Sequence, residues 1–259
     1  MTVEVQQSIG RAASVLTALA ESKTGPLRAS DIVRATGLGA STVARLLSSL
    51  EELGYVSKIA DTQSYGIGAA ILALASHGLN QNPLHRESRA AAQELAQRIG
   101  LSVNVGVRDG SSLIYLCHFE GAKAPKSHTM VGFRQPLHAS ALGKCLLIDM
   151  TEDERHAILG EDPLPRYTAN TITTHEQLTA ELAQIAILGT STEDQELALG
   201  RFCIAAPIRT AVGDVAAAIS ISGRLSLIRG VDLDEVREDL IEVADRISVA
   251  LGLISAVPH

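Results

Sequence analysis

The chain has 259 residues, which is long for one compact domain and favours two. Hydrophobic residues make up 46% of it, enough for packed cores, whereas aromatic residues make up only 3% and argue against a surface that stacks sugars or single-stranded nucleic acid. The formal net charge of −7 at pH 7 does not exclude double-stranded DNA as a partner, because residues 1–70 carry as many basic as acidic side chains.

The three cysteines, Cys117, Cys145 and Cys203, are odd in number and far apart in the sequence. There is no C-x-x-C or H-x-x-x-H motif, so we expect no metal and no cofactor. Separated, buried thiols fit a reducing compartment. The first residues lack the basic start and apolar run of a leader, and no stretch approaches the roughly 18 apolar residues that span a bilayer. We therefore expect a soluble, cytoplasmic protein with no membrane partner.

Three helices are predicted within the first 54 residues. The first covers residues 8–20; the second is capped by Ser30 and runs through Thr36 to a stop at Gly37. The segment GASTVARLLSSLEELGYV, residues 39–56, predicts the third. The predicted buried stripes are Ile9, Ala12, Ala13, Leu16 and Leu19 in the first helix, and Val43, Leu46, Leu47, Leu50 and Leu53 in the third. Two short helices joined by a tight turn with glycine are typical of a helix-turn-helix.

Two short β-prone runs come next, YVSKI at 55–59 and SYGIG at 64–68, with a polar tip between them. A hairpin directly after the second helix of a helix-turn-helix is a wing. Residues 1–68 are therefore predicted to form a winged helix-turn-helix DNA-binding domain, essentially all-α apart from the wing.

The outward face of the third helix is small and hydroxylated, with one guanidinium. The DNA major groove admits one helix, whose N-terminal half must approach without bulk. Hydroxyls there can donate to phosphates or base edges, and an arginine one turn later can bind a phosphate or a guanine. The alternative is an ordinary solvated helix pair. The predicted DNA contacts are Arg28, Ser41, Thr42, Arg45, Ser48 and Lys58.

Residues 69–79, AAILALASHGL, predict a helix too hydrophobic for a free linker. Two interpretations are compatible: a connector packed under the wing, or a contact between two subunits. We assign 69–81 as a linker helix and 82–259 as a second domain.

The second domain mixes strands and helices irregularly, with hairpins, which predicts an α+β fold with a mostly antiparallel sheet rather than a βαβ repeat. Asn82 is expected to cap its first helix, with Pro83 at the first position. The remaining expectations are a hairpin turning at Asp109-Gly110, a strand at 127–131, a helix at 138–150, capping boxes at Thr151/Glu154 and Thr174/Gln177, strands at 203–208 and 214–223, and a closing helix that buries Val236, Leu240, Val243, Ile247 and Ala250.

Four segments resemble the IclR (isocitrate lyase regulator) family of bacterial transcription regulators. They are the helix-turn-helix at 27–56, PLHASALGKCLL at 136–147, EDQELALGRFCIAAPI at 193–208 and VAAAISISG at 215–223. The resemblance implies a dimer or tetramer on a palindromic operator, and a GAF-like domain that binds a small, usually carboxylate-bearing metabolite. Two departures are a wing tip without basic or glycine residues, and Gln195 in place of a carboxylate.

The chemistry of the second domain suggests where that metabolite binds. Ser140, Ala141, Leu142 and Gly143 open a predicted helix whose free N–H groups favour an anion, and Lys144 adds positive charge. Ser220 and Ser222 point to one face of a strand. The resemblance adds Cys203 to the cavity lining and places Glu193 in the adjoining loop; the predicted effector-binding residues are Ser140, Ala141, Leu142, Gly143, Glu193, Cys203, Ser220 and Ser222. The alternative is that the serines bind neighbouring backbone and Cys203 is core.

Two other classes of function are alternatives to a ligand-responsive regulator that represses or activates. A cysteine-dependent enzyme would use Cys145 or Cys203 as nucleophile with His118 or His138 as base, but both cysteines lie in apolar runs that favour inert thiols. An assembly module without a ligand would need a purely apolar pocket, and the serine pair speaks against it.

Overall fold

The computed structural model describes residues 7–124, 130–228 and 230–252. The chain divides into two compact units, Met1–Gln81 and Asn82–His259. Among the described residues, no helix is long and apolar enough to cross a membrane.

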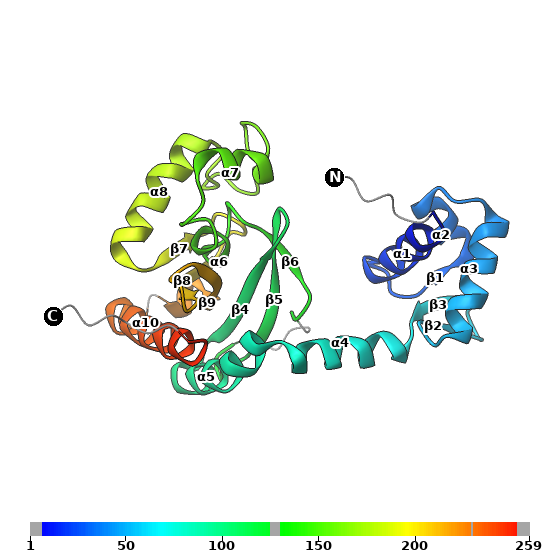
Figure 1. The fold of residues 1–259 in the computed structure, drawn as a ribbon, viewed down its shortest axis with the longest axis horizontal. Helices are drawn as coiled ribbons and strands as arrows, with labels where there is room; N and C mark the ends of the chain where they lie inside the picture. The colour runs from blue at the N-terminus through cyan, green and yellow to red at the C-terminus, as the bar shows by residue number, and fades with distance from the viewer. Residues whose placement is uncertain (1–6, 125–129, 229, 253–259) are drawn as a thin grey trace. The chain divides into compact units, whose positions relative to one another are not determined.

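In the first unit, α1 (Gln7–Ala20), α2 (Ala29–Thr36) and α3 (Ala40–Glu52) pack with a small antiparallel sheet, and α4 (Ala69–Gln81) follows the sheet in the chain (Figure 1). The strands are β1 (Leu27–Arg28), β2 (Val56–Ile59) and β3 (Ser64–Ile67), in the sheet order β1-β3-β2. This is a helix-turn-helix with a β-hairpin directly after it, as the sequence predicts.

The core of this unit comes from one side of each of its first helices. Val43, Leu47 and Leu50 of α3 are buried, as their spacing predicts. Leu53 is 62% exposed, contrary to prediction, because α3 ends at Glu52 and the chain turns away at Gly54 with a positive φ of 72°. The hydrophobic stripe therefore ends with the helix.

Two predictions for α1 and α2 are wrong in detail. In α1 the buried residues are Val15 and Leu19, whereas Ile9 is 61% exposed and Ala13 is also exposed. Helix α2 begins earlier than predicted, with Arg28 at the cap position and no side-chain cap, so Ser30 lies inside the first turn. Gly37 does end α2 in the left-handed conformation.

A six-stranded antiparallel sheet in the order β6-β5-β4-β9-β8-β7 forms the centre of the second unit. Its strands are β4 (Ser102–Asp109), β5 (Ser112–Phe119), β6 (Arg134–Pro136), β7 (Ser191–Asp194), β8 (Arg201–Arg209) and β9 (Val215–Arg224). Its helices are α5 (Pro83–Ile99), α6 (Ala141–Cys145), α7 (Glu152–Leu159), α8 (His175–Leu188), α9 (Leu225–Ile228) and α10 (Leu233–Ala250). The α+β fold with an antiparallel sheet is confirmed.

Helices cover both faces of this sheet (Figure 1). Helices α5 and α10 pack on one face, where the Ser88 hydroxyl lies 3.6 Å from Cys117 Sγ. Helix α6 packs on the other face against β7, β8 and β9, and α8 packs against α6. Cys203, Ala205 and Ala218 of the sheet join the apolar core of this second face.

Several local predictions for this unit can be compared with the structure. Asn82 caps α5, and the Thr151/Glu154 capping box is complete. At α8, Thr174 accepts the Gln177 N–H, but Gln177 Oε1 accepts from Thr173 N, so the second box is only half formed. Of the closing stripe in α10, Ala250 is exposed and the other four residues are buried.

Two element predictions fail around residues 127–150. Residues 127–129 of the predicted strand lie outside the described residues, and Met130 and Val131 are not in a strand. The edge strand is β6 instead. The helix predicted at 138–150 is confined to α6, because residues 138–147 are all buried and their apolar residues follow no single helical face.

Candidate functional site

One exposed face of α3 gathers the polar residues that were predicted to contact DNA. Ser41, Arg45 and Ser48 are exposed and succeed one another at intervals of four and three residues, so they lie on one side of the helix. Thr42 is half-buried beside them. This face carries no acidic residue until Glu51 and offers small side chains with one guanidinium.

Arg28 and Lys58 lie on the small sheet next to the helix-turn-helix. Arg28 ends β1 and is the cap residue of α2, and its Cα partner in β3 is Ser64. Lys58 lies on β2 with its Nζ 5.8 Å from the centre of the Tyr65 ring. Both side chains are exposed, which suits contacts with phosphates on either side of a groove.

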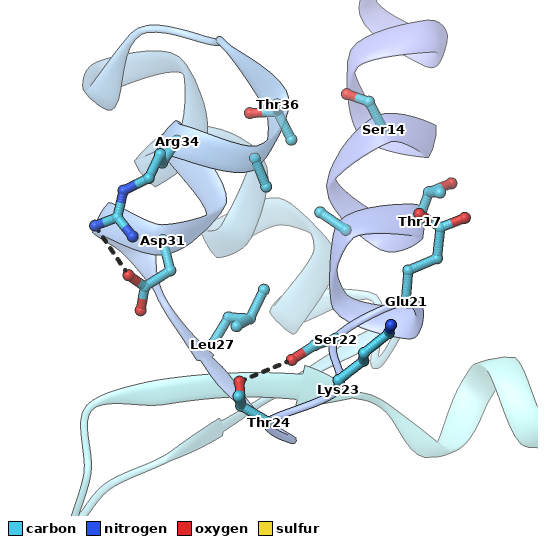
Figure 2. Close-up of a pocket in the computed structure, with 12 residues that line it drawn as sticks. Ser14, Thr17, Glu21, Ser22, Lys23, Thr24, Leu27, Asp31, Arg34 and Thr36 are labelled. Carbon is cyan, nitrogen blue, oxygen red and sulfur yellow. Dashed lines mark hydrogen bonds and ion pairs between the residues drawn. The ribbon is translucent and has the colours of Figure 1, made fainter.

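The first unit also has an open groove of about 730 Å³ between α1 and α2. Figure 2 shows Glu21 and Lys23 on one wall and Asp31 with Arg34 on the other. Arg34 and Asp31 form an exposed ion pair at 3.3 Å. Charges of both signs, none buried, favour neither an anion nor a cation, so this groove offers no defined ligand chemistry.

In the second unit, the predicted serine pair lies on the face of the sheet that α6 covers. Strand pairing places Ser222 opposite Cys203, and Cys203 opposite Glu193. Opposite residues on neighbouring strands share a face, so Glu193, Cys203, Ser220 and Ser222 come together across three strands. Ser220 and Ser222 therefore share one face of β9, as their spacing of two residues predicts.

Asn104, on β4, organises this polar patch and was not predicted. Its Nδ2 donates to Ser220 Oγ at 3.4 Å and to Ser222 Oγ at 3.2 Å. Its Oδ1 lies 2.7 Å from His118 Nδ1. Both serine hydroxyls thus accept a hydrogen bond from the Asn104 side chain. The signal in the sequence was a single amide inside the apolar run VNVGV.

Arg201 is the second unpredicted member of this face. Its Nε donates to Cys203 Sγ at 3.1 Å and lies 3.4 Å from Glu193 Oε2. The Glu193 side chain is completely buried, and its other oxygen accepts the Leu197 N–H at 3.1 Å. Burial raises the pKa of Glu193 despite the neighbouring Arg201, since desolvation disfavours the charged carboxylate.

The start of α6 is occupied by the chain itself. Ser140 Oγ donates to Pro136 O at 2.7 Å and accepts the Gly143 N–H at 3.2 Å. A Cβ on Gly143 would lie 2.2 Å from Leu137 O, so the close neighbour of this glycine is backbone. Ala141 and Leu142 belong to the apolar core. These four predicted effector residues therefore have structural partners.

The expectation that Lys144 adds charge to an anion site is wrong. Its side chain is fully buried, with Nζ 2.9 Å from Glu181 Oε1 on α8 and 2.7 Å from Glu196 Oε1 in the loop after β7. Two carboxylates already neutralise this ammonium. Lys144 therefore ties α6 to α8 and to that loop.

The two cysteines considered as nucleophiles are buried. Burial raises the pKa of Cys145 to about 11, and its Sγ lies 3.3 Å from Ser191 Oγ. Burial raises the pKa of Cys203 to about 12, even though Arg201 lowers it. Both groups are therefore neutral thiols at physiological pH, which argues against nucleophilic catalysis.

Comparisons with known families give two matches. Residues 8–59 match the family model described as the IclR helix-turn-helix domain, and residues 76–249 match that of the bacterial transcriptional regulator IclR C-terminal domain. The chain is 29% identical over 246 residues to the HTH-type transcriptional regulator XynR of Escherichia coli K12, covering 95% of this chain and 97% of XynR.

Solved structures are similar over most of the chain. An IclR transcriptional regulator from Alicyclobacillus acidocaldarius matches with a TM-score of 0.85 at 25% identity, over 96% of this chain and 100% of that one. An IclR homologue from Microbacterium hydrocarbonoxydans, solved with 4-hydroxybenzoate, matches with a TM-score of 0.83 at 26% identity, over 95% of this chain and 99% of that one.

Proposed function

The chain belongs to the IclR family of bacterial transcriptional regulators, and we propose that it binds a double-stranded DNA operator through α3. In this proposal, a small organic acid that binds the second unit lowers or raises the affinity for that DNA. The observation that carries the proposal is the face of α3, where Ser41, Arg45 and Ser48 stand exposed in a row while the opposite face is buried. A DNA-binding regulator of this kind acts in the cytoplasm.

In this proposal, residues 1–68 are the DNA-binding domain and each predicted contact has a defined part. Ser41 and Thr42 enter the major groove first, and Arg45 binds a base edge or phosphate one turn later. Ser48, Arg28 and Lys58 hold the backbone at the flanks. These contacts predict affinity that falls as salt rises, because phosphate binding releases counterions.

We propose that the protein acts as a dimer joined in part by α4. None of the thirteen residues of α4, all of them described, is buried, and Leu72 and Leu74 are 68% and 56% exposed. Such an apolar helix needs a cover, and a second copy supplies it symmetrically. The α3 helices of the two copies then bind the two halves of a palindromic operator. Pairing of two dimers gives the tetramer.

The effector part of the proposal rests on the polar face of the central sheet in residues 82–259, which we regard as GAF-like. Glu193, Cys203, Ser220 and Ser222 meet there, on the face of the sheet that α6 covers. The related protein crystallised with 4-hydroxybenzoate supports a small acid as the ligand class. Such an acid changes DNA affinity only if it binds one arrangement of the dimer better than the other.

Selection of genomic fragments on the purified full-length protein, and then fluorescence anisotropy with the enriched DNA, tests the proposal. We expect sequence-selective binding that weakens with salt. The R45Q variant should lose about 1–3 kcal/mol of binding free energy, as expected for a base-reading arginine. R108Q is the matched control, since Arg108 is an exposed arginine at the far end of β4. No enrichment over random DNA, or equal binding by R45Q and R108Q, would overturn it.

A further inference from the structure

A small hollow of about 290 Å³ opens at the ends of β4, β8 and β9. Ser102, Arg201, Ser222 and Arg224 line it, together with the backbone of Gly200 and Gly223. Ser102 is the Cα partner of Ser222, and Arg201 is the Cα partner of Arg224. Because partners share a face and residues two apart on a strand do too, all four side chains lie on the same side of the sheet. Of the predicted effector residues, only Ser222 lines this hollow.

The hollow carries excess positive charge. Like charges directly opposite one another destabilise an antiparallel pair, yet Arg201 and Arg224 are opposite. Arg201 has one carboxylate nearby, Glu193, at 3.4 Å. Within the described residues, no carboxylate forms an ion pair with Arg224, and no residue that lines the hollow is acidic. Among the described residues, Arg201 therefore has one carboxylate partner and Arg224 has none, so the charge of the hollow favours a further anion.

Arg201 is also held in place before any ligand arrives. Its Nε hydrogen bond to Cys203 Sγ and its contact with Glu193 fix one edge of the guanidinium, while 27% of the side chain stays exposed. Gln195 Oε1 accepts the Gly200 N–H at 3.1 Å and closes the loop that leads into Arg201. A planar guanidinium fixed in this way suits a carboxylate, which it can bind through two parallel hydrogen bonds.

We infer that this hollow binds the carboxylate of a small organic acid between Arg201 and Arg224, with the hydroxyls of Ser102 and Ser222 donating beside it. The inference rests on the proposed function, since it names the residues by which the effector unit recognises charge. It moves the anion contact from the start of α6 to the ends of β8 and β9. The volume lies at the lower end of the range for ligand pockets, about 300–1,000 Å³, so the acid is small.

Thermal unfolding of the full-length protein in the presence of propanoate, benzoate and succinate, each compared with its amide at equal ionic strength, tests this inference. A ligand that binds only the folded state raises the unfolding temperature. At least one acid should stabilise the wild type at millimolar concentration, and its amide should not. Sodium sulfate distinguishes a carboxylate site from a general anion site.

Three variants tie the response to the hollow. R201Q should lower the affinity for the acid about tenfold or more, as expected for loss of a bidentate, charge-assisted contact. R224Q removes an exposed arginine without leaving Glu193 unpaired, so it stays informative if R201Q fails to fold. R201K keeps the charge but loses the planar fork and should also weaken binding. R108Q, with the same loss of charge outside the hollow, should respond like the wild type.

The outcomes separate this inference from the proposed function. A shift that depends on acid and is reduced in R224Q and R201K supports it. No response of the wild type to any of the acids, full response in R224Q and R201K, or an equal response to sulfate overturns it. If the protein still binds its selected DNA in that case, only the anion site has failed. If the acid response depends on the arginines but the protein binds no DNA selectively, the anion site is supported and the proposed regulator function is rejected.

Discussion

Replacing Lys144 with Met is expected to lower the free energy of unfolding of the second unit by about 3 kcal/mol or more. The ammonium is fully buried between Glu181 Oε1 at 2.9 Å and Glu196 Oε1 at 2.7 Å. Met has a similar shape, so packing changes little, but two carboxylates lose their shared cation. Breaking a buried pair by removing one partner typically destabilises by about 3–5 kcal/mol.

The lower end of that range applies because the two carboxylates differ in exposure. The Glu181 side chain is 32% exposed and can turn towards water, whereas Glu196 is only 11% exposed. Most of the loss therefore comes from Glu196. At roughly 2–4 °C per kcal/mol for a unit of this size, the unfolding temperature should fall by about 6–12 °C.

The loss of stability in K144M should depend on pH in one direction. Burial raises the pKa of Glu196 above its usual value, and Lys144 opposes that rise. Without Lys144 the pKa rises further, so the folded state binds the proton more tightly than the unfolded state does. Stability then falls as pH rises from the unfolded pKa through the folded one. The difference between K144M and the wild type should be largest at neutral pH and shrink towards pH 4.5.

Urea unfolding monitored by far-UV circular dichroism at both pH values measures this difference, provided that the transition of the second unit is resolved. The double variant K144M/E196Q removes the stranded charge and should recover part of the loss, which a double-mutant cycle quantifies. E181Q alone should have a small effect. A K144M protein as stable as the wild type, or a deficit that grows on acidification, would refute the argument.

Two further predictions rest on burial and exposure. Cys145 and Cys203, whose pKa values burial raises to about 11 and about 12, should not react with iodoacetamide in the native protein at pH 8 but should react in urea; rapid labelling of one cysteine would revive the enzyme interpretation. L72E, which places a charge on exposed α4, should shift the protein from dimer to monomer in sedimentation equilibrium and weaken operator binding in parallel. A dimer that persists in L72E would remove α4 from the interface.

The helix-turn-helix was predictable because its signals are local. The stripe of Val43, Leu47 and Leu50 and the stop at Gly37 depend on neighbours within a few residues, and the structure has them as predicted. One error occurs where the end of a helix depends on the direction that the chain takes beyond it. Leu53 continues the spacing of α3, but the turn at Gly54 carries the chain away before it can be buried.

The same reasoning fails around α6 for a different reason. Nearly every residue from Leu137 to Leu147 is buried, polar and apolar alike. Amphipathic periodicity exists only when one side faces water, so this segment carries no spacing that fixes where a helix starts or stops. Its extent is set by the backbone of Leu137 packed on Gly143 and by the partners of Lys144.

The candidate site was predictable only in its strand geometry. Alternation along β9 placed Ser220 and Ser222 on one face. Their partner Asn104 lies 116 residues before Ser220, and the pairing of Arg201 with Arg224 depends on strand register, which a single sequence does not encode. A polar residue inside an apolar strand indicates that its side chain requires a hydrogen-bond partner. It does not indicate which residue that partner is.

Lys144 of α6 and Arg201 of β8 are both paired with carboxylates, but they differ in their capacity to bind a further anion. Lys144 has two carboxylate partners within 3 Å and no exposed surface, so it is saturated and acts as a tie between α6, α8 and the loop after β7. Arg201 has one carboxylate at 3.4 Å, a like-charged residue opposite it and part of its side chain exposed in a hollow. Apolar residues could replace a buried ion pair at little loss of stability. The incompletely paired charge of Arg201 is therefore better explained by ligand binding than by a contribution to folding. Strand β7 and the loop after it join the two, because Glu193 of β7 contacts Arg201 and Glu196 of the loop contacts Lys144. An acid bound at the free part of Arg201 would add a negative charge beside Glu193, three residues before Glu196, which gives ligand binding a route into the packing around Lys144.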